Sequence, residues 1–250
     1  MPSVKTVIRL PLHTLSQSPR MPINTRLRTA LFVSICGFFA LTVALVVVQP
    51  TKPALVMQPG VNSPIIGLEM ALSPYEVWNV IGDPQTTTGQ KIRAGFTLGT
   101  WIDFGYILAY SLCYLFLTWL LVSRHGVSWV WTLVTAVLVL GTAGSDVLEN
   151  LAIFKILNTG TESLVDLHID QLIVFTRLKW LLLGVQGLPA VMLFRKEGRR
   201  GPAFLLTVAF AFGALGIMKQ YAPEVMTLFL AFFWVYLFVK LLPLKNRWWA

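Results

Sequence analysis

Six long apolar stretches constrain this chain more than any other feature of its sequence. They run over residues 27–48, 96–122, 127–157, 171–194, 202–218 and 225–244. A helix needs about 20 mostly apolar residues to cross a bilayer, and it satisfies its own backbone hydrogen bonds there. The sequence therefore predicts an all-α fold, a polytopic membrane helix bundle with six transmembrane helices. The stretch over 202–218 is at the lower length limit, so five spans plus a re-entrant segment is the alternative.

The composition agrees with a chain that is surrounded by lipid. Hydrophobic residues make up 56% of it and charged residues only 12%, and the mean hydropathy is +0.69. Soluble domains carry about 25% charged residues, so this surface would not stay solvated in water. We therefore exclude a soluble enzyme, a disordered regulator and a nucleic-acid-binding domain. The partner that we expect is the lipid bilayer, with no nucleic acid.

The basic residues between the stretches predict how the chain is oriented. With the N-terminus inside, nine Lys and Arg residues fall in the inner segments and four in the outer ones, before any residue upstream of Met21 is counted. This bias favours a cytoplasmic N-terminal tail over 1–26, an outer loop over 49–95 and a cytoplasmic tail over 245–250. The expected location is the bacterial cytoplasmic (inner) membrane, with both termini in the cytoplasm.

The beginning of the chain allows two interpretations. Residues 1–68 contain no acid, and an acid-free segment with Arg and Ser is typical of a transit peptide. The interpretation that we favour is a true start at Met21, because Met21 leads almost directly into the first apolar stretch.

The outer loop contains one short helix signal. Ser73, Pro74 and Glu76 form a capping box with proline at the first helical position, and the apolar residues that follow end before Gly82. A helix over 74–81 is therefore predicted. We expect it to lie on the outer membrane surface or to cap the bundle, and a lid over an entrance between the helices is the alternative.

The most informative residues for function are ionisable ones inside the apolar stretches. Asp103, Glu149 and Lys179 each lie seven or eight residues from the outer end of their stretch, roughly 10–12 Å deep at 1.5 Å per residue. Asp146 lies one turn deeper than Glu149, and Arg177 lies slightly shallower than Lys179. Ionisable groups in membrane helices usually face the bundle interior and pair with one another. We therefore expect a polar cluster with Lys179 facing inward.

Helical periodicity places these residues on common faces, at about 100° per residue. Asp146, Glu149 and Asn150 share one arc of the third stretch, and Asp103 shares a stripe of the second stretch with tyrosines. We therefore predict one polar pocket in the outer half of the second to fourth spans. Its candidate ligand-binding residues are Asp103, Tyr106, Tyr110, Asp146, Glu149, Asn150 and Lys179.

This cluster has a structural and a functional interpretation. As a structural feature, it is an ion-pair network that specifies which helices pair. As a site, it binds a small polar molecule, a lipid headgroup, a proton or a cation, with Lys179 as counter-ion or anion anchor. The hypothesis that we favour is a non-enzymatic membrane protein with such a pocket. The alternatives are an accessory subunit of a larger complex, with a membrane-protein partner, and a membrane-embedded acid–base enzyme that acts on a lipid.

The sequence carries no signal for a cofactor or a metal. His13, His125 and His168 do not pair at ligand spacing, and Cys36 and Cys113 lie inside apolar stretches. A phosphate-binding loop and a dinucleotide fingerprint are also missing from the sequence. We therefore expect no cofactor, and no haem or metal site built on histidine or cysteine.

Overall fold

The computed structural model describes residues 25–216 and 218–242, and these form nine helices and no strand. The helices are α1 (Thr25–Val48), α2 (Pro64–Glu69), α3 (Pro74–Ile81), α4 (Thr87–His125), α5 (Val130–Leu157), α6 (Glu162–Val185), α7 (Leu188–Lys196), α8 (Arg200–Leu215) and α9 (Ala222–Leu241). Five helical segments, namely α1, α4, α5, α6 continued by α7, and α9, are long and apolar enough to cross a membrane. The predicted fold class, an all-α polytopic membrane helix bundle, is confirmed.

The segment predicted as the fifth span corresponds to α8, which has 16 residues. At 1.5 Å per residue it is roughly 24 Å long, less than the roughly 30 Å of a bilayer core. Six spans, and five spans with a re-entrant segment, therefore both stay predictions. The predicted tails over 1–26 and 245–250, including the start at Met21, lie outside the described residues, except that residues 25–26 begin α1.

The loop predicted over 49–95 is shorter in the structure, because its second half is largely helical. α4 begins at Thr87, where the Thr86 hydroxyl accepts a hydrogen bond from the backbone N–H of Gly89. α2 was not predicted, and α3 covers the residues 74–81 where a helix was expected. The Ser73 hydroxyl accepts a hydrogen bond from the backbone N–H of Glu76, as a helix cap does.

The segment predicted as the fourth span, 171–194, also has different bounds in the structure. α6 begins at Glu162, and the helix is interrupted at Gln186 and Gly187 before α7 continues it. Pro189 lies in the first turn of α7. Because proline has no N–H to donate to the preceding turn, the regular helix ends just before it.

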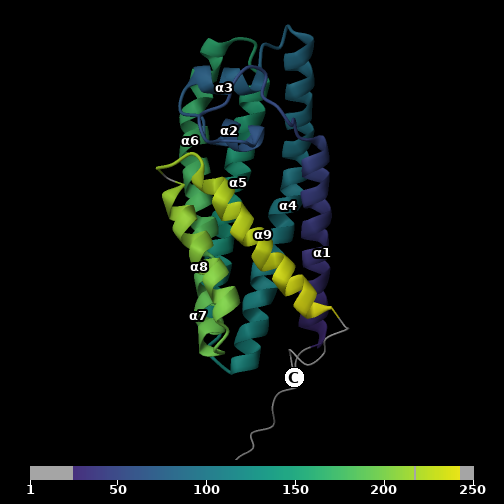
Figure 1. The fold of residues 1–250 in the computed structure, drawn as a ribbon, viewed down its shortest axis with the longest axis vertical. Helices are drawn as coiled ribbons and strands as arrows, with labels where there is room; N and C mark the ends of the chain where they lie inside the picture. Colours follow the sequence, from purple (N-terminus) through teal and green to yellow (C-terminus); the bar gives the residue numbers. More distant parts are fainter. Residues whose placement is uncertain (1–24, 217, 243–250) are drawn as a thin grey trace, which may run out of the picture.

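One side of the bundle is crossed by α9. The most extensive helix–helix contacts join α1 with α4, α4 with α5, α5 with α6, and α8 with both α6 and α9. Figure 1 shows α9, in yellow, running diagonally from the neighbourhood of α2 to the opposite end of α1. The two helices meet at that opposite end, where the rings of Phe32 and Phe238 stack with centroids 5.4 Å apart. From there, α1 and α9 diverge toward α2.

Arg93 joins the segments at the end of the bundle that carries α2 and α3. Its guanidinium donates to the carbonyl of Gly82, directly after α3, and to the carbonyls of Leu157 and Thr159, at the end of α5. The apolar side of α3 is buried against this end. α3 therefore covers the end of the bundle, and the cavity described below is lined by α2 instead.

Candidate functional site

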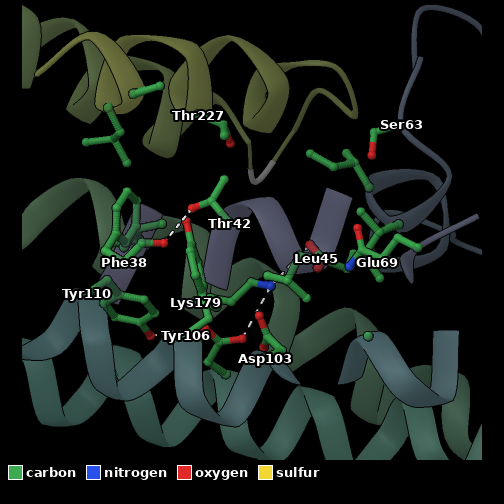
Figure 2. A pocket seen from close by; sticks show the side chains of 18 of the residues that line it. Phe38, Thr42, Leu45, Ser63, Glu69, Asp103, Tyr106, Tyr110, Lys179 and Thr227 are labelled. Atoms are coloured by element: carbon green, nitrogen blue, oxygen red, sulfur yellow. Dashed lines mark hydrogen bonds and ion pairs between the residues drawn. The ribbon is translucent and has the colours of Figure 1, made fainter. Parts of the chain in front are cut away.

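A cavity of about 410 Å³ lies between α1, α2, α4, α5, α6 and α9. Asp103 of α4, Asp146 of α5 and Lys179 of α6 make one wall polar, whereas α1 and α9 contribute mainly apolar and aromatic side chains such as Phe38 and Trp234. Figure 2 shows Lys179, Asp103 and the tyrosines of α4 gathered along the polar wall. The volume is within the range of about 300–1,000 Å³ that small-molecule sites occupy.

Lys179 is the centre of the polar wall. Its Nζ lies 3.1 Å from Glu69 Oε2 and 3.5 Å from Asp146 Oδ1, and it contacts Glu149 Oε1 as well. Lys179 is 6% exposed and Glu149 is fully buried. An ammonium group has three N–H donors, and here three carboxyl groups lie within ion-pair distance of them. The lysine is therefore already engaged as a counter-ion, which leaves little of its charge for an anionic ligand.

Asp103 has a different environment on the same wall. Asn150 Nδ2 donates a hydrogen bond of 2.8 Å to Asp103 Oδ2, and among the described residues no basic side chain lies within ion-pair distance of Asp103. The neighbouring carboxyl of Asp146 accepts a 3.0 Å hydrogen bond from the Tyr110 hydroxyl. Asp103 therefore lines the cavity with an amide as its partner and without a counter-ion in contact.

The acidic groups of this site outnumber its basic group. Four carboxyls, those of Glu69, Asp103, Asp146 and Glu149, surround the single amine of Lys179. Four ionised carboxylates would leave a net charge of about −3 in a region shielded from water, which is costly. Burial raises the pKa of the Glu69 carboxyl above its ordinary value, while the charge of Lys179 acts in the opposite direction. Protons or a bound cation would relieve this surplus charge.

The seven residues predicted from the sequence are close together in the structure. Six of them line the cavity: Asp103, Tyr106, Tyr110, Asp146, Asn150 and Lys179. The seventh, Glu149, is buried and contacts Lys179 without being part of the lining. Their role in binding a ligand stays a prediction, because contact among them is also what a structural network requires.

Sequence reasoning missed Glu69, which comes from the short helix α2. The available signal was weak: Ser63 and Pro64 can begin a helix, and Glu69 is the first acidic residue of the chain. Hydropathy alone assigns this segment to an outer loop. In the structure Leu68 is fully buried, and the end of α2 inserts Glu69 beside Lys179.

Comparison with protein families, with curated proteins and with solved structures found no match to this chain. Because a helix bundle does not by itself imply a function, the function must be inferred from the chemistry of the cavity.

Proposed function

We propose that this chain is a non-enzymatic multi-pass membrane protein that binds a proton or a cationic group at Asp103, inside the cavity. The observation that carries the proposal is the position of Asp103. It lines the cavity with the Asn150 amide as its side-chain hydrogen-bond partner among the described residues, whereas the one amine of the cluster is held by three other carboxyls. Ionisable residues inside membrane helices are costly, and a functional site is the default explanation for them.

The charge balance selects among the ligand classes that the sequence left open. An anion would meet a surplus of carboxyl groups and a lysine that is already paired. A proton or a cation would relieve the same surplus. Both neutralise the carboxyl of Asp103, so they compete for it, and each weakens binding of the other by the same factor. We therefore expect a cation to bind more tightly as pH rises and to release protons when it binds.

The proposal also includes a location. With both termini in the cytoplasm of a bacterium, the end of the bundle that carries α2 and α3 faces the outside. The cavity then lies in the outer half of the inner membrane. The bias of basic residues toward the inner segments supports this orientation.

Isothermal titration calorimetry with ethylammonium as the probe tests the proposal. The full chain in a neutral detergent is titrated in two buffers of different ionisation enthalpy, which counts the protons released. Asp103→Asn keeps the shape of the side chain and removes its charge, and we expect it to weaken binding by about ten- to hundredfold. Asp166→Asn, at an exposed acid near the start of α6, is the matched control. Equal affinity in Asp103→Asn and wild type, with circular dichroism unchanged, would refute the proposal.

A second function is supported by the contacts of Lys179. Through Glu69, Asp146 and Glu149 it joins α2, α5 and α6, as a network that specifies helix pairing would do. Such a protein would serve as an accessory subunit of a larger membrane complex. This alternative predicts a stoichiometric partner after mild extraction and no effect of Asp103→Asn on any measured binding.

A further inference from the structure

At the end of the bundle that carries α2, hydrogen bonds join the α2 segment to the beginning of α9. Glu224, in the first turn of α9, accepts hydrogen bonds from the backbone N–H groups of Asn62 and Ser63, at 2.7 Å and 2.8 Å. At the other end of α2, Gln220 Nε2 donates to the carbonyl of Met70 at 3.1 Å. The segment that contains α2 is therefore tied to the beginning of α9 on both sides of the helix. These bonds hold the α2 segment against α9 beside the lining residues Ser63 and Glu224.

The same cavity has an apolar, accessible rim between α1 and α9. Val46 of α1 lines it and is 69% exposed, and Thr227 and Ala231 of α9 line it and are exposed too. Figure 2 shows Thr227 on one side of the cavity and Thr42 of α1 on the other. This rim lies where α1 and α9 diverge, on a side of the bundle that faces lipid in a membrane-spanning chain.

The cavity therefore has a polar inner wall with surplus acid and an exposed, mainly apolar rim between α1 and α9. We infer that its ligand is an amphiphile with an ammonium head group, which enters sideways from the membrane between α1 and α9. The head group lies at Asp103, and the alkyl chain leaves along the rim. This inference rests on the proposed function, because it takes the cation site at Asp103 and specifies which cation reaches it.

The surfaces of such a ligand match those of the cavity. An ammonium head group on an alkyl chain gains a charged hydrogen bond to Asp103 in a place shielded from water. Its chain moves from lipid to an apolar rim at little cost, since both surroundings are apolar. A small hydrophilic cation can bind at Asp103 but leaves the apolar rim empty. An anionic amphiphile would place its charge next to four carboxyl groups and one paired amine.

Photocrosslinking tests where the chain of such a ligand lies. The probe is decylammonium with a diazirine at the end of the chain that is far from the nitrogen, and decanol with the same group is the uncharged control. The full chain is reconstituted in neutral lipid bilayers, irradiated and mapped by mass spectrometry. We expect crosslinks on α1 near Val46 and on α9 near Ala231, with a yield that falls about tenfold or more in Asp103→Asn and with decanol.

Two tryptophan variants separate the lateral route from general binding to the bundle. Ala231→Trp narrows the rim, whereas Val235→Trp places the same side chain one turn away, at an exposed residue outside the lining. We expect the crosslink yield to fall in the first variant and to stay unchanged in the second. Equal yields in both, crosslinks on α2, or equal labelling by decanol would overturn the inference.

The calorimetric experiment with ethylammonium distinguishes failure of this inference from failure of the proposed function. Loss of ethylammonium binding in Asp103→Asn, together with crosslinks scattered over all helices, would support the cation site and refute the inference that the ligand is an amphiphile. If Asp103→Asn changes neither ethylammonium binding nor the crosslink yield, both proposals are refuted.

Discussion

Replacing Lys179 with methionine removes the one amine that three carboxyl groups share. Lys179 lies within ion-pair distance of Glu69, Asp146 and Glu149, and Glu149 is fully buried. Methionine has a similar length and no charge, so the change removes the counter-ion with little change in volume. The acids stay in place without a partner, and each must either keep an uncompensated charge or take up a proton.

Two estimates of the loss in free energy of unfolding lead to different expectations for Lys179→Met. Polar contacts between membrane helices are worth about 0.6 kcal/mol on average, which would make the lysine nearly dispensable. Removing one partner of a buried ion pair costs about 3–5 kcal/mol, because the other charge is left buried. The second value applies here, since Lys179 is 6% exposed and its acceptors remain. We therefore expect Lys179→Met to lower the free energy of unfolding by about 3–5 kcal/mol.

The assay is unfolding of the full chain in mixed micelles with increasing dodecyl sulfate, followed by far-ultraviolet circular dichroism. Lys155→Met is the matched control, because Lys155 is exposed and, within the described part of the chain, donates only to Gln171, at 3.2 Å. We expect it to lower the free energy of unfolding by about 0.5 kcal/mol or less. Adding Glu149→Gln to Lys179→Met should recover roughly 1–2 kcal/mol by removing one uncompensated acid. If Lys179→Met costs no more than the control, the lysine is not the counter-ion of the cluster.

Three further predictions concern packing, pH and the end of the bundle. Gly213→Ala should lower the free energy of unfolding by about 1–3 kcal/mol, since a Cβ there would lie 2.9 Å from the carbonyl oxygen of Trp180. Gly144→Ala, with open space around it, is the control in the same unfolding assay. Because burial raises the pKa of Glu69, its contribution to stability is present at low pH and is lost as pH rises through the raised value. As pH rises, the free energy of unfolding should therefore fall less steeply in Glu69→Gln than in wild type. Parallel curves for the two proteins would contradict this. Arg93→Lys should lower the free energy of unfolding by about 2–3 kcal/mol and speed amide hydrogen exchange around α3. The reason is that an ammonium group cannot replace the hydrogen bonds of the guanidinium to three separate carbonyls. Exchange rates equal to those of wild type would count against this role.

The sequence alone was sufficient for the membrane class and for much of the polar cluster. Length and hydropathy of a stretch are local properties, and the bilayer imposes the helix on any stretch that is long and apolar enough. Helical periodicity is local too, which is why the spacing of Asp146 and Asn150 is enough to assign them to one face. The rise per residue then places Asp103 and Lys179 at one depth. Six of the seven predicted residues do line one cavity.

The tertiary structure decided which charges are paired and which segments line the cavity. Glu69 enters the site because α2 is tied to α9 by Glu224 and Gln220, residues about 150 positions further along the chain. Asp103 is left without a basic contact because Lys179 is held by three other acids. α1 and α9 both line the cavity and also contact each other at the opposite end of α1, because α9 crosses the bundle diagonally (Figure 1). Crossing angles and ion-pair partners depend on how separate segments pack together, and this information is not contained in the pattern of any one segment.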